Sequence, residues 1–297
     1  MSPYLPEGVT PDLYPFTGKF LELKNGIKMH YLDEGSGKPV VMVHGNPTWS
    51  FYYRKLAAAL KHGSRVIVPD HVGCGLSDKP GDDKYDYTLK NRADDLETLL
   101  ESLGVKEKIT LVLHDWGGMI GMTYAVRHPE RIEKIVLMNT GAFFLPKGKS
   151  FPPAMWLART PLGALLVRGF NAFAAVSARV CCKRRALSPE LRRAYTAPYN
   201  SWANRIATLR FVQDVPVKPG DKAYAVVKDT QEKLSLFASL PILIFWGMKD
   251  FIFDQHFLSE WQRLYPKAEV HIFPDCGHYI LEDAQEDIIP LVKKFIA

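Results

Sequence analysis

The chain has 297 residues, of which 47% are hydrophobic, 12% aromatic and 24% charged. This balance supports a large core and a soluble surface, and the sequence contains no internal repeat or low-complexity tract. The length allows two domains, but an α/β chain of this size often forms one core with an insertion.

The net charge is +6, and basic residues cluster at 183–185 and 192–193. Such a cluster is compatible with an anionic membrane or nucleic-acid surface. A solvated helix explains it more simply, so we expect no nucleic-acid partner, while surface association and homo-oligomers stay open. The most apolar window, 161–182, holds Arg168 and Arg179, which would share a face of one helix. We interpret it as amphipathic and expect no membrane span.

The start of the chain and its cysteines indicate the compartment. Met1-Ser2-Pro3 opens neither a basic nor an apolar stretch, so no signal peptide is expected. The four cysteines show no CxxC spacing. The adjacent pair Cys181-Cys182 is a candidate redox pair, but buried or idle thiols are the simpler interpretation. We therefore expect a cytoplasmic protein.

In chain order, alternating residues at 21–23 and 27–33 predict two strands joined by a turn at Asn25-Gly26. An antiparallel start followed by βα units predicts an α/β fold with a mostly parallel, eight-stranded sheet and helices on both faces. Continuous apolar strands are expected at 39–43, 65–69, 109–113, 132–138, 241–246 and 269–273. Helical patterns occupy 89–103, 255–264 and 282–295, the last interrupted or bent by Pro290.

Too many residues for one crossover lie between the strands ending at 139 and starting at 241. The segment 141–216 has helical composition, prolines at expected helix starts and many aromatic residues. We interpret it as a helical cap over the carboxyl ends of the strands, where α/β sheets bind ligands. The predicted organisation is a core domain of residues 1–140 and 217–297 with an inserted cap of residues 141–216.

The strand predicted at 109–113 runs into HDWGG (114–118), and a helical pattern follows at 119–128. A sharp strand-to-helix turn of this kind presents one reactive side chain above the sheet, which here is Asp115. A carboxylate is already ionised at pH 7, so it can attack carbon directly and form an ester. No G-x-S-x-G occurs, and Ser77, which comes closest, follows no strand.

Other candidate residues follow other strands. The backbone N–H groups of Asn46 and Trp116 are placed to stabilise an oxyanion, and their side chains are two donors suited to a halide. Asp250 and His278 follow the last two strands, so nucleophile, acid and histidine occur in the order of an α/β-hydrolase triad. Asp254 is a rival acid, but it resembles a helix N-cap. No carboxylate follows the strand at 132–138, which leaves the alternative position for the acid empty.

Six segments resemble the haloalkane dehalogenases, a family of capped α/β-hydrolases, over nearly the whole chain. They are HGNPTWS (44–50), DHVGCGLSDKP (70–80), YDYTL (85–89), HDWGG (114–118), WGMKD (246–250) and GHYILED (277–283). The resemblance implies Asp115 as nucleophile, His278 as base and Asp250 as acid. It implies Asn46 and Trp116 as halide donors, which is the pattern of the third subfamily. Leu113 departs from the usual elbow, which has a small residue there, and is expected to shift it slightly.

The cap segments RGFNAF (168–173), APYNSWANRI (197–206) and RFVQDVP (210–216) also resemble the β-lactone decarboxylases of bacterial alkene synthesis. Those enzymes share the same five residues and make a cis-alkene and carbon dioxide. The leading hypothesis is hydrolysis of an apolar haloalkane to alcohol and halide, through an alkyl ester on Asp115 and without metal or organic cofactor. Decarboxylation of a cis-β-lactone is the alternative.

Two further functions have weaker support. Epoxide hydrolases use the same elbow, but they usually carry a bulky apolar residue at the position of Asn46. They also use cap tyrosines, for which Tyr195 and Tyr199 are candidates. The second is a non-catalytic receptor on the same scaffold. A receptor does not need an acid, a base and a nucleophile, so the complete set in this chain argues against that interpretation.

Overall fold

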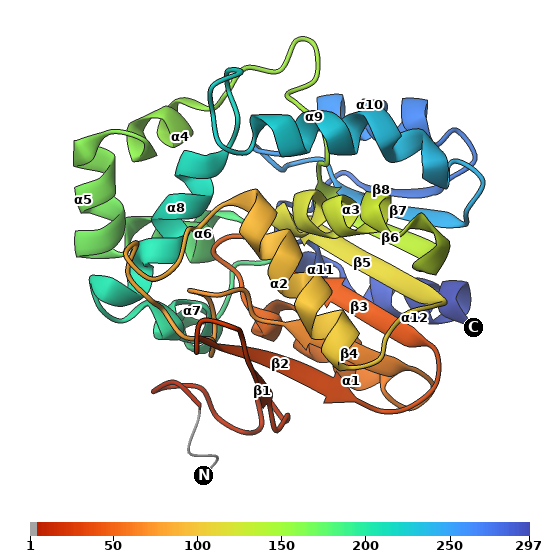
Figure 1. Ribbon diagram of the computed structural model, residues 1–297, viewed down its shortest axis with the longest axis horizontal. Coiled ribbons are helices and arrows are strands. Elements are labelled where there is room, and N and C mark those ends of the chain that lie inside the picture. Colours follow the sequence, from red (N-terminus) through yellow and green to blue (C-terminus); the bar gives the residue numbers. More distant parts are fainter. Residues whose placement is uncertain (1–4) are drawn as a thin grey trace.

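The computed structural model describes residues 5–297, and one sheet of eight strands runs through it (Figure 1). The strand order is β1-β2-β4-β3-β5-β6-β7-β8. β2 is antiparallel to β1 and β4, and every other pair is parallel, so the predicted sheet is confirmed. The strands are β1 Lys19–Glu22, β2 Lys28–Glu34, β3 Pro39–Val43, β4 Arg65–Pro69, β5 Ile109–Asp115, β6 Ile132–Thr140, β7 Ile242–Gly247 and β8 Glu269–Phe273.

Helices cover both faces of the sheet, which explains why its central strands are continuous apolar runs. In β3, Val41 and Val43 join one hydrophobic cluster, which includes side chains of α2, α3, α9 and α10. Val40 and Met42 point the other way and join a cluster with α1, α11 and α12. These helices are α1 Arg54–Leu60, α2 Leu89–Ser102, α3 Trp116–Arg127, α9 Tyr224–Lys233, α10 Gln255–Leu264, α11 Ile280–Asp283 and α12 Gln285–Ile296.

The predicted bounds of β3, β4, β8 and α10 are confirmed, but the closing helix differs from its prediction. It consists of α11 and α12, which are separated at Ala284, where φ is −133°. The helix α12 continues through Pro290. A proline removes the bond to the carbonyl four residues earlier, here that of Glu286. Glu286 is exposed, so water can satisfy its carbonyl and α12 is not interrupted at Pro290.

Five α-helices between β6 and α9 lie together beyond one end of the sheet, and we call these five helices the cap (Figure 1). Asn171, with a left-handed φ of 54°, separates α5 from α6, and the two helices meet at 75°. The window 161–182 is therefore not one helix, and Arg168 and Arg179 do not share a face. The five helices are α4 Pro153–Ala158, α5 Pro161–Phe170, α6 Ala172–Val180, α7 Pro189–Thr196 and α8 Ile206–Asp214.

Among the described residues no single helix is long and apolar enough to cross a membrane. Within residues 5–297 one bent pair, α5 and α6, reaches the required length and hydropathy when the two helices are counted together. The expectation about a signal peptide rests on Met1-Ser2-Pro3, which lies outside the described residues.

The packing of α3 against β5 accounts for the unusual Leu113. A Cβ atom added to Gly121 would overlap the Leu113 side chain, which is fully buried. The volume that Leu113 adds at the end of the strand is therefore accommodated by the missing side chain at Gly121, within the first turns of α3.

We expect Gly121→Ala and Leu113→Ala to be strongly non-additive, with a coupling of roughly 1–3 kcal/mol in the free energy of unfolding. The new methyl group crowds Leu113, but it fits the space that Leu113→Ala leaves. The gain in helix propensity occurs in both backgrounds and cancels in the cycle. Urea denaturation of the four proteins measures the coupling.

A matched control is Gly63→Ala, because nothing lies within 4 Å of a Cβ atom at that position. This substitution should leave the free energy of unfolding unchanged or raise it slightly in both backgrounds. Additive effects of Gly121→Ala and Leu113→Ala would contradict the packing argument.

Candidate active site

Asp115 ends β5 and directly precedes α3, in the predicted strand-to-helix turn. Its φ of 54° and ψ of −126° are rare for a residue other than glycine. Two glycines allow the close packing that holds this turn. A Cβ atom on Gly117 would overlap the carbonyl of Val43, and one on Gly118 would overlap the hydroxyl of Thr140. The start of α3 therefore lies tightly against the ends of β3 and β6.

The turn after β3 holds the carboxylate of Asp115. The backbone N–H of Asn46 donates to Oδ1 of Asp115 at 2.6 Å, and a Cβ atom on Gly45 would overlap the same carboxylate. Burial raises the pKa of Asp115, but the hydrogen bond and charge of His278 outweigh it and hold this pKa below its ordinary value. The carboxylate is therefore buried, ionised and already bound at the predicted oxyanion position.

His278 lies between two carboxylates in the loop after β8. Its Nδ1 is 2.7 Å from Oδ2 of Asp250, and its Nε2 is 3.4 Å from Oδ2 of Asp115. Burial lowers the pKa of His278, but the carboxylates of Asp250 and Asp115 outweigh it and raise this pKa to about 10. The ring is therefore protonated at pH 7, and the structure brings the three predicted residues together.

The loop after β7 positions Asp250, whose Oδ1 accepts hydrogen bonds from the N–H groups of Ile252 at 2.7 Å and Phe253 at 3.1 Å. Its other oxygen remains directed at His278. The rival acid Asp254 caps α10 by accepting from the N–H of His256 at 3.0 Å. Asp254 therefore has the local role that its sequence position predicts.

Asn139 is a positioning residue that the sequence did not reveal. Its Nδ2 donates to the carbonyl of Gly247 at 3.0 Å, and its Oδ1 accepts from the N–H of Gly247 at 2.8 Å. Asn139 lies near the end of β6, the alternative position for the acid. It thus fixes the end of β7, from which the loop that carries Asp250 begins. The asparagine directly after the strand predicted at 132–138 was the feature of the sequence that could have indicated this role.

A buried network behind Asn46 was also missed. Asp70 accepts from His30 Nδ1 at 2.8 Å and from the N–H of Ser50 at 2.6 Å. Burial raises the pKa of Asp70, but His30 outweighs it and this pKa falls to about 2. The next residue, His71, donates through its N–H to His44 Nε2 at 3.2 Å and through Nε2 to the carbonyl of His44 at 2.9 Å. These contacts fix the turn that carries the Asn46 N–H. The segment DHVGCGLSDKP (70–80) was the feature of the sequence that could have indicated this network.

The two predicted halide donors lie at the wall of a cavity. Nδ2 of Asn46 donates one hydrogen bond to the carbonyl of Thr208 in α8, at 3.0 Å. One of its two side-chain N–H groups is therefore hydrogen-bonded to the cap. The sequence did not predict this contact. The ring of Trp116 packs edge-on against Phe211, and within residues 5–297 its indole N–H has no hydrogen-bond partner. The indole N–H and the second N–H of Asn46 remain as donors.

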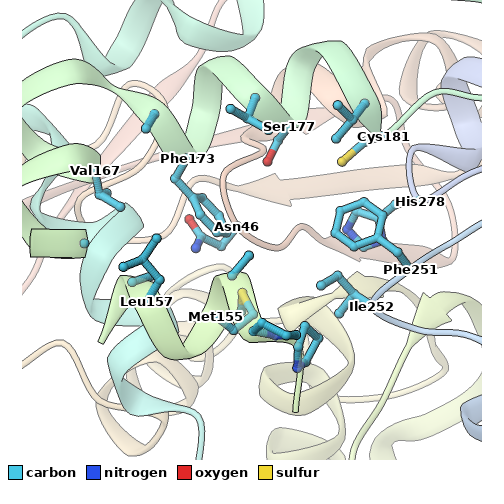
Figure 2. A pocket seen from close by; sticks show the side chains of 18 of the residues that line it. Asn46, Met155, Leu157, Val167, Phe173, Ser177, Cys181, Phe251, Ile252 and His278 are labelled. Carbon is cyan, nitrogen blue, oxygen red and sulfur yellow. The ribbon is translucent and has the colours of Figure 1, made fainter. Parts of the chain in front are cut away.

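The cavity has a volume of about 650 Å³, and both Asp115 and His278 line it. Figure 2 shows His278 and Asn46 at its wall, together with side chains of the cap. Its walls are mainly apolar side chains of α4, α5 and α6, and Ser177 of α6 and Cys181, which directly follows α6, point into it. A second apolar cavity of about 100 Å³, lined by residues such as Phe143 and Phe257, also reaches Asp115 and Trp116. The carboxylate of Asp115 therefore lies where two apolar cavities meet.

Two earlier interpretations depend on side chains of the cap. Tyr195 donates to Glu282 at 2.5 Å and Tyr199 to the carbonyl of Thr48 at 3.4 Å, and neither lines the cavity, so the epoxide-hydrolase interpretation lacks its tyrosines. Cys181 and Cys182 are buried and form no disulfide, and burial raises the pKa of both thiols.

The basic cluster at 183–185 is partly neutralised, because Arg184 pairs with Asp275 and Asp287. In the described part of the chain no three His, Cys, Asp or Glu side chains are grouped to bind a metal ion.

Comparison with known proteins identifies a family and several relatives of this chain. A family model described as alpha/beta hydrolase fold matches residues 38–285. The cis-3-alkyl-4-alkyloxetan-2-one decarboxylase of Shewanella oneidensis is 61% identical, over 96% of this chain and 89% of that protein. The protein of the same name from Xanthomonas campestris is 45% identical, over 95% and 97%.

Proteins named haloalkane dehalogenase are less similar. Haloalkane dehalogenase 2 of Mycobacterium tuberculosis is 30% identical over 94% of either chain. A haloalkane dehalogenase structure from Agrobacterium tumefaciens superposes with a TM-score of 0.85, at 23% identity over 97% and 99% of the two chains, which confirms the predicted fold. Of the two resemblances in the sequence, the comparisons favour the lactone decarboxylases over the leading dehalogenase hypothesis.

The position of His278 predicts the effect of removing each neighbouring acid. Asp250→Asn should lower the pKa of His278 by about 2, because one of the two carboxylates that raise it is lost. Titration of the imidazole by nitrogen-15 NMR measures this pKa. Asp254→Asn is the matched control and should leave it unchanged, since Asp254 caps α10 instead. An equal fall of the His278 pKa in both variants would contradict the assignment of Asp250 as the acid that pairs with His278.

Proposed function

This chain belongs to the alpha/beta hydrolase family, and we propose that it decarboxylates a cis-3,4-dialkyl β-lactone to a cis-alkene and carbon dioxide. The observation that carries the proposal is the place of Asp115, at the junction of apolar cavities of about 650 and 100 Å³. A lactone substituted on adjacent ring carbons sends two alkyl chains away from one reacting centre. The names of the relatives at 61% and 45% identity support the same substrate class.

In the first step Oδ2 of Asp115 attacks C4, the saturated ring carbon that bears oxygen. The C4–O bond breaks and its electron pair stays on the oxygen, which becomes part of a carboxylate on C3. The product is an alkyl ester of Asp115 with inverted configuration at C4. The indole N–H of Trp116 and the second N–H of Asn46 are donors for the new carboxylate, where a dehalogenase would bind its halide.

In the second step the bond between C3 and the carboxylate breaks and releases carbon dioxide. Its electron pair forms the C3–C4 double bond, while the C4–O bond to Asp115 breaks and regenerates the enzyme carboxylate. Inversion at C4 places the two leaving groups anti to each other, so anti elimination retains the cis arrangement of the alkyl chains. The protonated ring of His278, 3.4 Å from Oδ2, stabilises the charge that returns to Asp115.

Haloalkane hydrolysis is the second candidate, and the two free donors of Trp116 and Asn46 favour it. That reaction needs a neutral histidine, which removes a proton from water. Ester formation removes the charge of Asp115, one of the two carboxylates that raise the pKa of His278. The base can therefore form after the first step, and experiment has to separate the two reactions.

We expect purified protein to convert a cis-3,4-dialkyl β-lactone to alkene much faster than it releases bromide from a bromoalkane of equal chain length. Gas chromatography of the alkene and ion chromatography of bromide measure both rates. Asp115→Ala should lower alkene formation by roughly 10⁴-fold or more, because the nucleophile is lost. Asp254→Asn is the control and should retain activity. Bromide release without alkene would make the protein a dehalogenase.

A labelling experiment tests the elimination step itself. During lactone turnover in oxygen-18 water, Asp115 should acquire no label, because elimination returns both of its own oxygens. Hydrolysis of an ester on Asp115 would introduce one labelled oxygen. Mass spectrometry of the peptide that contains Asp115 distinguishes the two, and label in this peptide would rule out the proposed second step.

A further inference from the structure

The outer side of the cap carries large exposed apolar side chains. Phe170 is 72% exposed, Leu162 59% and Val176 53%. Isolated apolar residues are common on protein surfaces, but large exposed apolar side chains on three consecutive helices make this side of the cap a candidate interaction surface. We define the apolar cap face as Trp156, Leu157, Leu162, Leu165, Phe170 and Val176, on α4, α5 and α6.

Helix α5 is apolar on both sides. Leu166 and Val167 line the large cavity, whereas Leu162 and Leu165 are exposed on the outside. Its only charged residue is Arg168, whose guanidinium lies 4.7 Å from the centre of the Trp202 ring. A helix that is apolar all round is normally buried in protein or in contact with lipid.

The large cavity opens onto this face. Leu157 and Val176 line the cavity and are also 43% and 53% exposed, so they lie at its mouth. An apolar molecule that leaves the cavity there meets an apolar surface before it meets water.

A concave site rich in arginine lies beside the apolar cap face, between α6 and α7. This cavity of about 310 Å³ is lined by Arg179, Arg192 and Arg193, and we call it the arginine pocket. Among residues 5–297 no carboxylate lies within ion-pair distance of these three arginines, in contrast to Arg184 with its two aspartates. Guanidinium groups without carboxylate partners are suited to phosphate oxygens.

We propose that the apolar cap face docks on an anionic lipid bilayer, with lipid phosphates in the arginine pocket. Charge complementarity selects this occupant over a second copy of the chain, which would bring six arginines to one interface of proteins with net charge +6 each. The cavity mouth then opens into the bilayer, where apolar substrates and products partition.

Vesicle sedimentation tests the proposal, with phosphatidylcholine alone and with phosphatidylcholine mixed with phosphatidylglycerol. The protein should bind the anionic vesicles, and the binding should weaken as salt is added. Arg192→Gln/Arg193→Gln should lower the partition coefficient by about 25-fold, because each basic residue at such a surface contributes roughly a factor of five. Phe170→Ser should also weaken binding, and its exposure makes the substitution benign for folding.

A matched control removes two charges far from the cap. Lys293→Gln/Lys294→Gln changes exposed residues of α12 and should leave vesicle binding unchanged. Equal losses in this control and in the arginine variant would overturn the proposal, as would equal binding to neutral vesicles or no binding at all. A dimer in size-exclusion chromatography that Phe170→Ser dissolves, without vesicle binding, would identify a second copy as the occupant and refute lipid docking. Binding is measured without turnover, so failure here leaves the proposed decarboxylation untouched.

Discussion

The candidate active site depends on one arrangement of buried charge, in which protonated His278 lies between the carboxylates of Asp115 and Asp250. A buried ion is costly unless it is paired and hydrogen-bonded, and each of these three groups meets that condition. The backbone N–H of Asn46 satisfies the remaining oxygen of Asp115, and the loop after β7 satisfies that of Asp250. The arrangement is therefore stable only as a unit, and a substrate that esterifies Asp115 changes the balance for all three.

The scaffold of the site explains how such a unit is held in place. Glycines at 45, 117 and 118 allow backbone and side chains to approach where any Cβ atom would overlap them. Asn139 fixes the start of the Asp250 loop, and the contacts between His44 and His71 fix the turn of Asn46. The donors are positioned before a substrate arrives, which is the condition under which electrostatic stabilisation is most effective.

The sequence predicts what depends on local pattern, and it misses what depends on contacts between distant segments. Strands such as β3 and β4 are evident from apolar runs between turns, and the three candidate catalytic residues follow from their places after strands. The accommodation of Leu113 by Gly121 and the commitment of Asn46 to Thr208 depend on packing that no local pattern encodes. The break at Asn171 was missed because a left-handed residue can end one helix and begin another without proline or glycine.

The identity of the substrate was undecided in the sequence for a chemical reason. In the proposed mechanism a haloalkane leaves an ester on Asp115 with no electron pair available on the neighbouring carbon, so only water can release it. A β-lactone leaves a carboxylate on that carbon, whose loss expels the enzyme carboxylate directly. The same side chains therefore serve hydrolysis or elimination according to what the substrate carries. Motifs around Asp115 cannot separate the two reactions, and the distinction has to lie in the cavities that select the substrate, most of whose walls belong to the cap.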